Sequence, residues 1–296
     1  MVRIVEVGPR DGLQNERIPI PTDMKLRFIR DLVDAGLREI EVSSFVSPKW
    51  VPQLSDAAEL FAALGEREAT FSALVPNMKG VERAIASGVK HIALFTAASD
   101  AFTQKNINMS VDESLAAFAE VAEHFRAHMP DGTVRGYIST AFECPYSGRV
   151  EPSAVGRVAK ILNEDIEVDE ISLGDTIGVA VPKEVKVLHE HVAMYVPQSK
   201  IAWHFHDTRG TAIANVAKAL ELDYRTFDSS AGGLGGCPYA PGAGGNLATE
   251  DLVYFLQRNG IETGVDLAKL AKATLPVFEA LKRAPFARAQ LAALAG

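Results

Sequence analysis

The sequence predicts an α/β fold, a (β/α)8 TIM barrel with extra C-terminal helices, and three observations support this prediction. The chain has 296 residues, a common length for one such barrel. Short apolar runs alternate with stretches that have the periodicity of amphipathic helices. Unusual polar residues directly follow several of the apolar runs, which is where barrels of this kind carry their chemistry.

Eight apolar runs are predicted to be strands, because they are short and several are rich in Val and Ile. They span residues 2–7, 39–42, 70–75, 91–95, 134–140, 170–173, 201–205 and 226–228. Strands that alternate with helices indicate parallel pairing through right-handed crossovers, and eight such units can close into a barrel. An open doubly wound sheet is the alternative, but no G-x-G-x-x-G motif follows the first predicted strand.

Helices are predicted between these strands and after the last of them. Residues 110–125 place apolar side chains on one face at helical spacing, and Ser110 and Glu113 are spaced for a capping box at its start. After the eighth unit, residues 267–281 and 288–294 are expected to be helices that pack beside the barrel or at a subunit contact.

We expect a single catalytic domain over residues 1–296, because no low-complexity linker interrupts the chain. The barrel would occupy residues 1 to about 260, and the helical addition about 261–296. A homodimer is compatible with these added helices, although the sequence does not establish an oligomeric state.

The composition restricts the class of partner. Lys and Arg total 30 and Asp and Glu total 38, and this formal charge of −8 argues against nucleic acid. No uninterrupted apolar run is long enough to cross a membrane. Two cysteines are too few for a disulfide framework, which indicates a reducing compartment. With no signal peptide recognisable before the first strand, we expect a cytoplasmic enzyme.

Two polar clusters at predicted strand ends are candidates for the functional site. Arg10 and Asp11 follow the first strand, although this pair alone is equally compatible with a structural salt bridge. His204 and His206 lie two residues apart on the seventh strand, so both imidazoles would face the same side. Two imidazoles with the adjacent Asp207 carboxylate suit a divalent transition metal or Mn²⁺, whereas packed polar residues are the alternative.

A glycine-rich segment, residues 231–246, follows the eighth strand. A loop of this length in a barrel is a candidate lid, and a surface loop without structure is the alternative. Cys237 argues against that alternative, because an exposed thiol is a liability unless it is used. Asn246 would cap the next helix and offer an amide oxygen. Glu41 and Asp175 also end strands, and for Glu41 a structural role is the preferred interpretation.

Six long segments match the pattern of one enzyme family. They are VEVGPRDGLQNE (5–16), SSFVSPKWVPQ (43–53), FTQKNIN (102–108), EISLGDTIGV (170–179), HFHDTRG (204–210) and AGGLGGCPYAPGAGGNLATEDLVY (231–254). Over residues 4 to about 266 the chain resembles the 3-hydroxy-3-methylglutaryl-CoA lyases of the DRE-TIM metallolyase group. The last segment resembles the signature around the catalytic cysteine of that family and is the most specific of the six.

The resemblance implies a metal site for Mg²⁺ or Mn²⁺. Asp11, His204 and His206 would be the metal ligands, with Asn246 a fourth or outer ligand. The implied activity is a metal-dependent retro-Claisen cleavage of 3-hydroxy-3-methylglutaryl-CoA to acetyl-CoA and acetoacetate.

The resemblance also implies roles in catalysis and in binding the acyl-CoA substrate. Arg10 would be the catalytic arginine, and Cys237 the lid cysteine that protonates the enolate. His204, Asp11 and Asp175 are all candidates for the general base, and the sequence does not decide among them. The residues expected in catalysis are Arg10, Cys237, Asp175, Glu41 and His204, and those expected at the nucleotide end of CoA are Lys105 and Asn106.

Two departures from the family pattern concern the acyl substrate. Arg209 stands where the family usually has tyrosine, and Glu143 stands where a small residue is commoner before Cys144. A lyase for another branched 3-hydroxyacyl-CoA is therefore an alternative, and so is a related pyruvate aldolase, although Cys237 favours the lyase. Claisen-type synthases usually need an additional C-terminal domain, and the about 30 residues after Asp266 are too few for one.

Two further classes are alternatives outside this group of enzymes. A zinc hydrolase also uses a His-x-His pair, but usually places it early in a barrel rather than on the seventh strand. A scaffold without catalytic activity would not need polar groups that converge at strand ends.

Overall fold

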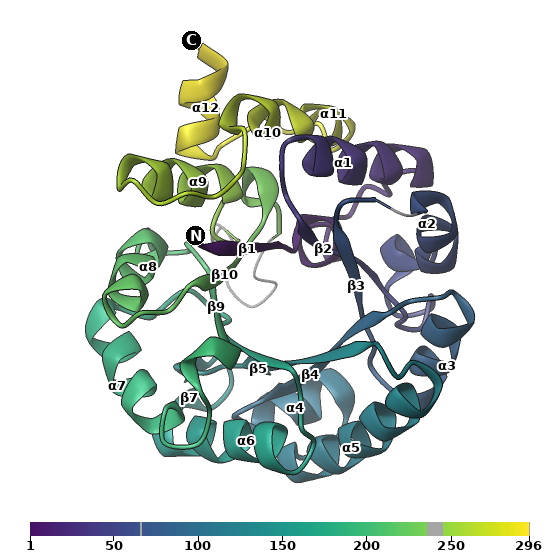
Figure 1. Ribbon diagram of the computed structural model, residues 1–296, viewed down its shortest axis with the longest axis vertical. Helices are drawn as coiled ribbons and strands as arrows, with labels where there is room; N and C mark the ends of the chain where they lie inside the picture. The colour runs from purple at the N-terminus through teal and green to yellow at the C-terminus, as the bar shows by residue number, and fades with distance from the viewer. Residues whose placement is uncertain (66, 236–244, 296) are drawn as a thin grey trace.

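The protein is described by a computed structural model that covers residues 1–65, 67–235 and 245–295. Eight parallel strands close into a barrel in the order β1-β10-β9-β8-β5-β4-β3-β2, as predicted (Figure 1). The barrel strands are β1 (Arg3–Glu6), β2 (Glu39–Ser44), β3 (Thr70–Leu74), β4 (His91–Ala97), β5 (Thr133–Ser139), β8 (Glu170–Asp175), β9 (Ile201–Phe205) and β10 (Thr226–Ser229). A small antiparallel hairpin, β6 (Glu143–Cys144) and β7 (Gly148–Arg149), follows β5.

Helices surround the barrel, and those at the C-terminal end of the chain gather beside it near β1 and α1 (Figure 1). The ring contains α1 (Thr22–Asp34), α2 (Ala57–Leu64), α3 (Met78–Ala86), α4 (Asp100–Ile107), α5 (Val111–His128), α6 (Pro152–Glu164), α7 (Pro182–Val192) and α8 (Ala212–Glu221). The added helices are α9 (Thr249–Arg258), α10 (Leu267–Ala273), α11 (Leu275–Ala280) and α12 (Arg288–Ala295). None of the helices in the described part of the chain has the length and apolarity that a bilayer span requires.

Two local predictions about helices have different outcomes. The capping box of α5 is present, because Glu113 N donates to Ser110 Oγ at 3.2 Å and Ser110 N donates to Glu113 Oε2 at 2.7 Å. The single helix expected over residues 267–281 is wrong, since the chain forms α10 and α11 with Thr274 between them. A proline in the first turn of α11 suits the start of a new helix, because it has no backbone N–H to donate.

The outward faces of the strands and the inner faces of the helices form the apolar core, in which Trp203 and Phe205 stack at 5.4 Å between ring centroids. The interior of the barrel is polar instead. Arg135 on β5 lies 2.6 Å from Asp228 on β10, and these strands are not neighbours, so the two side chains meet across the interior. Barrel interiors are more often filled by branched apolar residues. This barrel therefore has a buried ion pair in its interior.

Candidate metal centre and active site

The candidate site lies at the C-terminal ends of the strands. After β1 the chain turns through a single π-helical turn, Gly8–Gly12, in which Gly12 N donates to Val7 O at 3.2 Å. Turns of this type are rare in proteins, and those that occur are often found at functional sites. This turn carries Arg10 and Asp11, the first cluster predicted from the sequence. It brings both side chains to the mouth of the barrel beside β2 and β9.

The structure brings Asp11, His204 and His206 together. One potential ligand atom from each of the three lies within 4.8 Å of the others. His204 is part of β9 and His206 follows it, and their ring centroids are 5.3 Å apart. Both imidazoles therefore face one side, as their spacing predicted. No other group of three such residues was found in the described part of the chain.

Asn246 joins this cluster because residues 245–247 pair with the segment that follows β9. Asp207 N donates to Gly245 O at 2.9 Å, and His206 and Asn246 form an antiparallel bridge. Asn246 Nδ2 donates to Asp11 Oδ2 at 2.8 Å. Gly235 permits this approach, since a Cβ at that position would lie only 2.8 Å from Asn246 Nδ2.

The donor set fits a divalent cation. His206 Nδ1 and Asn246 Oδ1 are buried and have no hydrogen-bond partner within the described ranges. Buried polar atoms are rarely left unpaired, and these two belong to the cluster that also contains the Asp11 carboxylate. Imidazole nitrogens and carboxylate or amide oxygens are ligands for divalent metals such as Mn²⁺.

The charges of these groups also suit metal binding. Burial alone would raise the pKa of the Asp11 carboxyl. The positive charge of Arg10 is the largest of several effects that outweigh burial and lower this pKa to about 2. Burial, together with the neighbouring His204, lowers the pKa of His206 to about 4. At neutral pH Asp11 is therefore an anion, and His206 is a neutral imidazole with a lone pair.

Arg10 is held by two carboxylates and an aromatic ring. Its Nε donates to Glu41 Oε1, and its Nη1 donates to Asp11 Oδ1 at 2.7 Å. The guanidinium carbon lies 5.5 Å from the centroid of the Tyr137 ring. Glu41 also accepts a hydrogen bond from the Tyr137 hydroxyl at 2.7 Å. Glu41 therefore orients the Arg10 guanidinium.

Asp175 holds the loop that follows β8. Its two carboxylate oxygens accept hydrogen bonds from Val179 N at 2.9 Å and Ala180 N at 3.1 Å. Burial raises the pKa of this carboxyl to about 6. Arg209 supports the same loop, since its Nη1 donates to Ile177 O at 2.8 Å and Gly178 O at 3.0 Å. Arg209 therefore contacts backbone carbonyls of the loop.

Three other residues singled out in the sequence lie outside the cluster. Lys105 and Asn106 are exposed on α4, where Asn106 Nδ2 donates to Phe102 O at 2.8 Å. Glu143 is exposed on β6. Cys237 lies outside the described residues.

Four residues of the site were missed by sequence reasoning: Arg135, Tyr137, Ser172 and Asp228. Each projects into the barrel interior, and together they connect the Glu41 carboxylate with His204. A signal was present in the fifth predicted strand, where Arg135 and Tyr137 alternate with Val134, Gly136 and Ile138. Such a pattern indicates a polar interior face.

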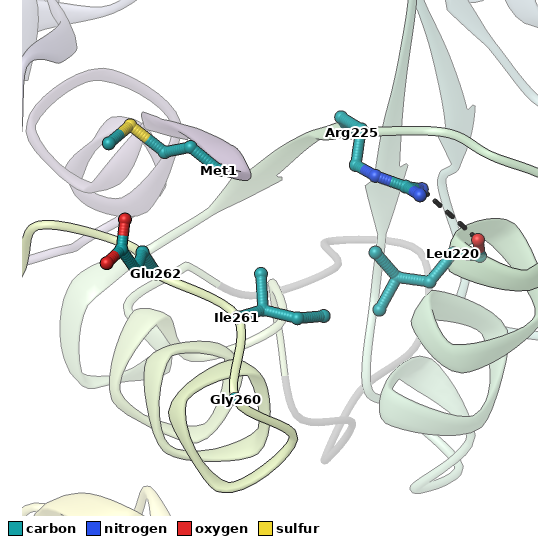
Figure 2. A pocket seen from close by; sticks show the side chains of 6 residues that line it. All are labelled: Met1, Leu220, Arg225, Gly260, Ile261 and Glu262. Atoms are coloured by element: carbon teal, nitrogen blue, oxygen red, sulfur yellow. Dashed lines mark hydrogen bonds between the residues drawn. The ribbon is translucent and has the colours of Figure 1, made fainter.

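A cavity of about 450 Å³ opens at the opposite end of the barrel, where its lining includes residues that precede β1 and β10 (Figure 2). Arg225, the one arginine in its lining, donates to Leu220 O at 3.2 Å and to Tyr224 O at 2.8 Å. In barrel enzymes this end of the strands serves stability rather than catalysis. The cavity is therefore not the candidate site.

Comparisons with known proteins agree with this geometry. The family model described as HMGL-like matches residues 1–277. The 3-hydroxy-3-isohexenylglutaryl-CoA/hydroxy-methylglutaryl-CoA lyase of Pseudomonas aeruginosa is 50% identical over 99% of this chain and 97% of that protein. The mitochondrial hydroxymethylglutaryl-CoA lyase of Bos taurus is 50% identical over 95% of this chain and 86% of its own length.

A solved structure is similar over the whole fold. The crystal structure of hydroxymethylglutaryl-CoA lyase from Pseudomonas aeruginosa has a TM-score of 0.96 and 50% identity, covering 99% of this chain and 97% of that one. The sequence match and the shared barrel agree along nearly the full length of the chain. The protein therefore belongs to the HMGL-like family.

Proposed function

We propose that this protein cleaves 3-hydroxy-3-methylglutaryl-CoA to acetyl-CoA and acetoacetate in a metal-dependent retro-Claisen reaction. The observation that carries the proposal is the cluster of Asp11, His204 and His206 at the mouth of the barrel. The side chain of Arg10 donates a hydrogen bond to the Asp11 carboxylate. Relatives at about half identity over nearly the full chain carry the name of this activity.

The reaction requires three events. A base removes the proton from the tertiary hydroxyl, and the electrons of that O–H bond form the ketone of acetoacetate. As that ketone forms, the bond between the carbinol carbon and the carbon next to the thioester breaks, and its electrons form the enolate of acetyl-CoA. A proton added to the enolate carbon completes the products. When bound, a divalent cation, Mg²⁺ or Mn²⁺, supplies Lewis-acid polarisation of the substrate oxygens.

Arg10 stabilises the negative charge that develops on the thioester oxygen. Its guanidinium is oriented in advance by Glu41 and Asp11, so no reorganisation is needed when the charge appears. Arginine suits this role because it remains protonated and offers several donors in a rigid plane.

Asp11 and His204 both belong to the metal cluster, so the base that removes the hydroxyl proton is Asp11 if His204 Nε2 binds the metal, and His204 if it does not. Asp175 is the third candidate for the base: backbone N–H groups of its own loop donate to both carboxylate oxygens, and burial raises its pKa to about 6. Cys237, which lies outside the described residues, donates the proton to the enolate. Lys105 and Asn106 contact the nucleotide end of CoA, and their exposure on α4, which follows β4, supports this role.

A coupled assay tests the proposal. Purified protein is incubated with 3-hydroxy-3-methylglutaryl-CoA and Mg²⁺ or Mn²⁺, then with EDTA, and both products are quantified. We expect acetyl-CoA and acetoacetate in equal amounts, and only with metal. Metal-bound, folded protein that yields neither product contradicts the proposal.

A larger branched substrate is the second candidate. The Pseudomonas aeruginosa relative is named for 3-hydroxy-3-isohexenylglutaryl-CoA as well as the methyl compound. The same assay with both substrates compares their kcat/KM values. A higher value for the isohexenyl compound favours this second candidate, whereas cleavage of pyruvate adducts or of simple esters identifies an aldolase or a hydrolase.

A further inference from the structure

Asp228, on β10, contacts one of the two histidines of the metal cluster. Its Oδ2 lies 3.1 Å from Nδ1 of His204, on the neighbouring strand β9. Asp228 is 1% exposed, so this contact is shielded from water. Asp228 is not among the residues assigned to the proposed reaction.

The position of the Asp228 carboxylate is itself determined by two other donors. Arg135 Nη2 donates to Oδ1 at 2.6 Å, and Ser172 Oγ donates to Oδ2 at 2.8 Å. Arg135 also lies 2.7 Å from Glu170. These partners come from β5 and β8, so the carboxylate is held from across the barrel and cannot turn away from His204 without breaking a buried ion pair.

A carboxylate beside a guanidinium is an acceptor only. The hydrogen between Asp228 Oδ2 and His204 Nδ1 must therefore be carried by the imidazole. A neutral imidazole with hydrogen on Nδ1 has its lone pair on Nε2, which lies on the other side of the ring. That nitrogen is the one available to a metal shared with Asp11 and His206.

We propose that Asp228 is a positioning residue that fixes His204 as the Nδ1–H tautomer and presents its Nε2 to the metal site. The inference rests on the metal-dependent function proposed above. Carboxylates commonly orient metal-binding histidines in this way, and their loss typically weakens metal binding about 10- to 100-fold. His206 differs, because its Nδ1 has no partner among the described residues. The orienting effect therefore applies to His204 alone.

A purely structural role for Asp228 is the competing explanation, because it pairs with the buried Arg135. Glu170→Gln provides the matched control. It removes the charge of the other carboxylate beside Arg135 and leaves both Asp228 and His204 in place. A general disturbance of the buried ion pairs would affect both variants, whereas a positioning role affects only variants of Asp228.

The substitution Asp228→Asn is expected to reverse the tautomer of His204. Arg135 carries donors only, so the oxygen of the introduced amide is expected to remain on the side of Arg135. The amide NH2 group then faces His204, and Nδ1 must become an acceptor. The hydrogen moves to Nε2, and the lone pair is removed from the metal site.

The test uses the full chain with ¹⁵N-labelled histidine, freed of metal, and long-range ¹H–¹⁵N correlation spectra that distinguish the two tautomers. The spectra are recorded at alkaline pH, where imidazoles are neutral, and we expect Nδ1–H at His204 in the wild type and in Glu170→Gln, and Nε2–H in Asp228→Asn. Equilibrium dialysis with Mn²⁺ is expected to show affinity weakened about 10- to 100-fold in Asp228→Asn and changed less than about twofold in Glu170→Gln.

Several outcomes overturn the inference. One is a wild-type His204 that carries its hydrogen on Nε2, a result that needs no variant to fold. Another is an unchanged tautomer or Mn²⁺ affinity in Asp228→Asn, and a third is an equal effect of Glu170→Gln. Failure of the proposed function is distinguishable, because a wild type that binds Mn²⁺ with the expected tautomer but does not cleave the thioester refutes only the reaction.

Discussion

Arg10 donates a hydrogen bond through Nε to the carboxylate of Glu41, and this bond joins the turn after β1 to strand β2. Glu41 is 1% exposed and its second oxygen accepts the Tyr137 hydroxyl at 2.7 Å. A buried carboxylate that is itself held in place thus sets the direction of the guanidinium. The orientation of Arg10 exists before substrate binds, which is what stabilisation of a developing charge requires.

Replacement of this arginine tests its role in the reaction. Arg10→Ala is expected to lower kcat about 100- to 1,000-fold, because loss of one such contact typically costs about 2.7–4 kcal/mol of barrier. Binding of Mn²⁺ is expected to persist, since no predicted metal ligand is removed. Steady-state kinetics and equilibrium dialysis measure the two effects separately. Arg10→Lys keeps the charge but not the planar fork, so its kcat should lie between those of the wild type and Arg10→Ala. A wild-type kcat in Arg10→Ala would contradict the assignment.

The metal site can be tested through His206. His206→Ala is expected to lose stoichiometric Mn²⁺, because it removes one of three clustered donors. Metal analysis after dialysis against micromolar Mn²⁺ measures the loss. His128→Ala, which removes an exposed imidazole from α5, is the matched control and should retain full occupancy. Full Mn²⁺ occupancy in His206→Ala would show that His206 is not a ligand.

The two cysteines are expected to differ in their effect on turnover. Cys237→Ser should lower kcat about 100- to 10,000-fold, the range typical of a lost general acid, while Mn²⁺ stays bound. Cys144→Ser is the matched control, because Cys144 is 1% exposed on the β6–β7 hairpin, where its Sγ accepts a hydrogen bond from Tyr146 N, and it has no assigned role in the reaction. Steady-state kinetics under reducing conditions measure kcat for both variants and for the wild type. Equal kcat values for Cys237→Ser and the wild type would remove Cys237 from the mechanism.

The fold could be predicted because its signals are local. The alternation of apolar runs and helical stretches lies in contiguous segments, and the eight predicted runs correspond to the eight barrel strands. The metal cluster could be predicted for the same reason. Asp11 follows one strand directly, and His204 and His206 lie at the end of another, so their meeting depends only on parallel strands ending at one edge.

The interior network could not be predicted, because its contacts depend on how the barrel closes. Arg135 and Asp228 are 93 residues apart and lie on strands that do not pair. Which interior side chains meet across the barrel is set by strand tilt and stagger, and no local pattern encodes these. The helix expected over residues 267–281 is two helices for a different reason, because the proline in the first turn of α11 has no backbone N–H to donate within a continuous helix.

Two buried carboxyls at the base of the glycine-rich segment predict a dependence of stability on pH. Glu6 accepts hydrogen bonds from Ala231 N at 2.8 Å and Thr249 Oγ1 at 2.6 Å, and Glu250 accepts one from Gly232 N at 2.7 Å. Burial raises the pKa of Glu6 from 4.5 to about 7 and that of Glu250 from 4.5 to about 8. The folded protein therefore holds these protons more tightly than the unfolded chain does.

The sign of the effect follows from that difference. The contribution to stability is fully present below about pH 4.5, where both states are protonated, and is lost as the pH rises toward 7 and 8. Each proton retained only by the folded state gives a slope of up to about 1.4 kcal/mol per pH unit in the free energy of unfolding. Glu250→Gln removes one of the two titrating groups and keeps an oxygen that can accept Gly232 N, so it should lessen the slope.

Urea unfolding between pH 5.5 and 8.5, in EDTA so that metal binding does not contribute, measures this slope. The free energy of unfolding of the wild type is expected to fall across the range, and that of Glu250→Gln to fall less steeply. The two curves should therefore converge at high pH, or cross there. Glu120→Gln, which changes an exposed carboxylate on α5, should follow the wild type. Parallel curves for Glu250→Gln and the wild type would mean that Glu250 is already ionised in the folded protein, and that the hydrogen bond from Gly232 outweighs its burial.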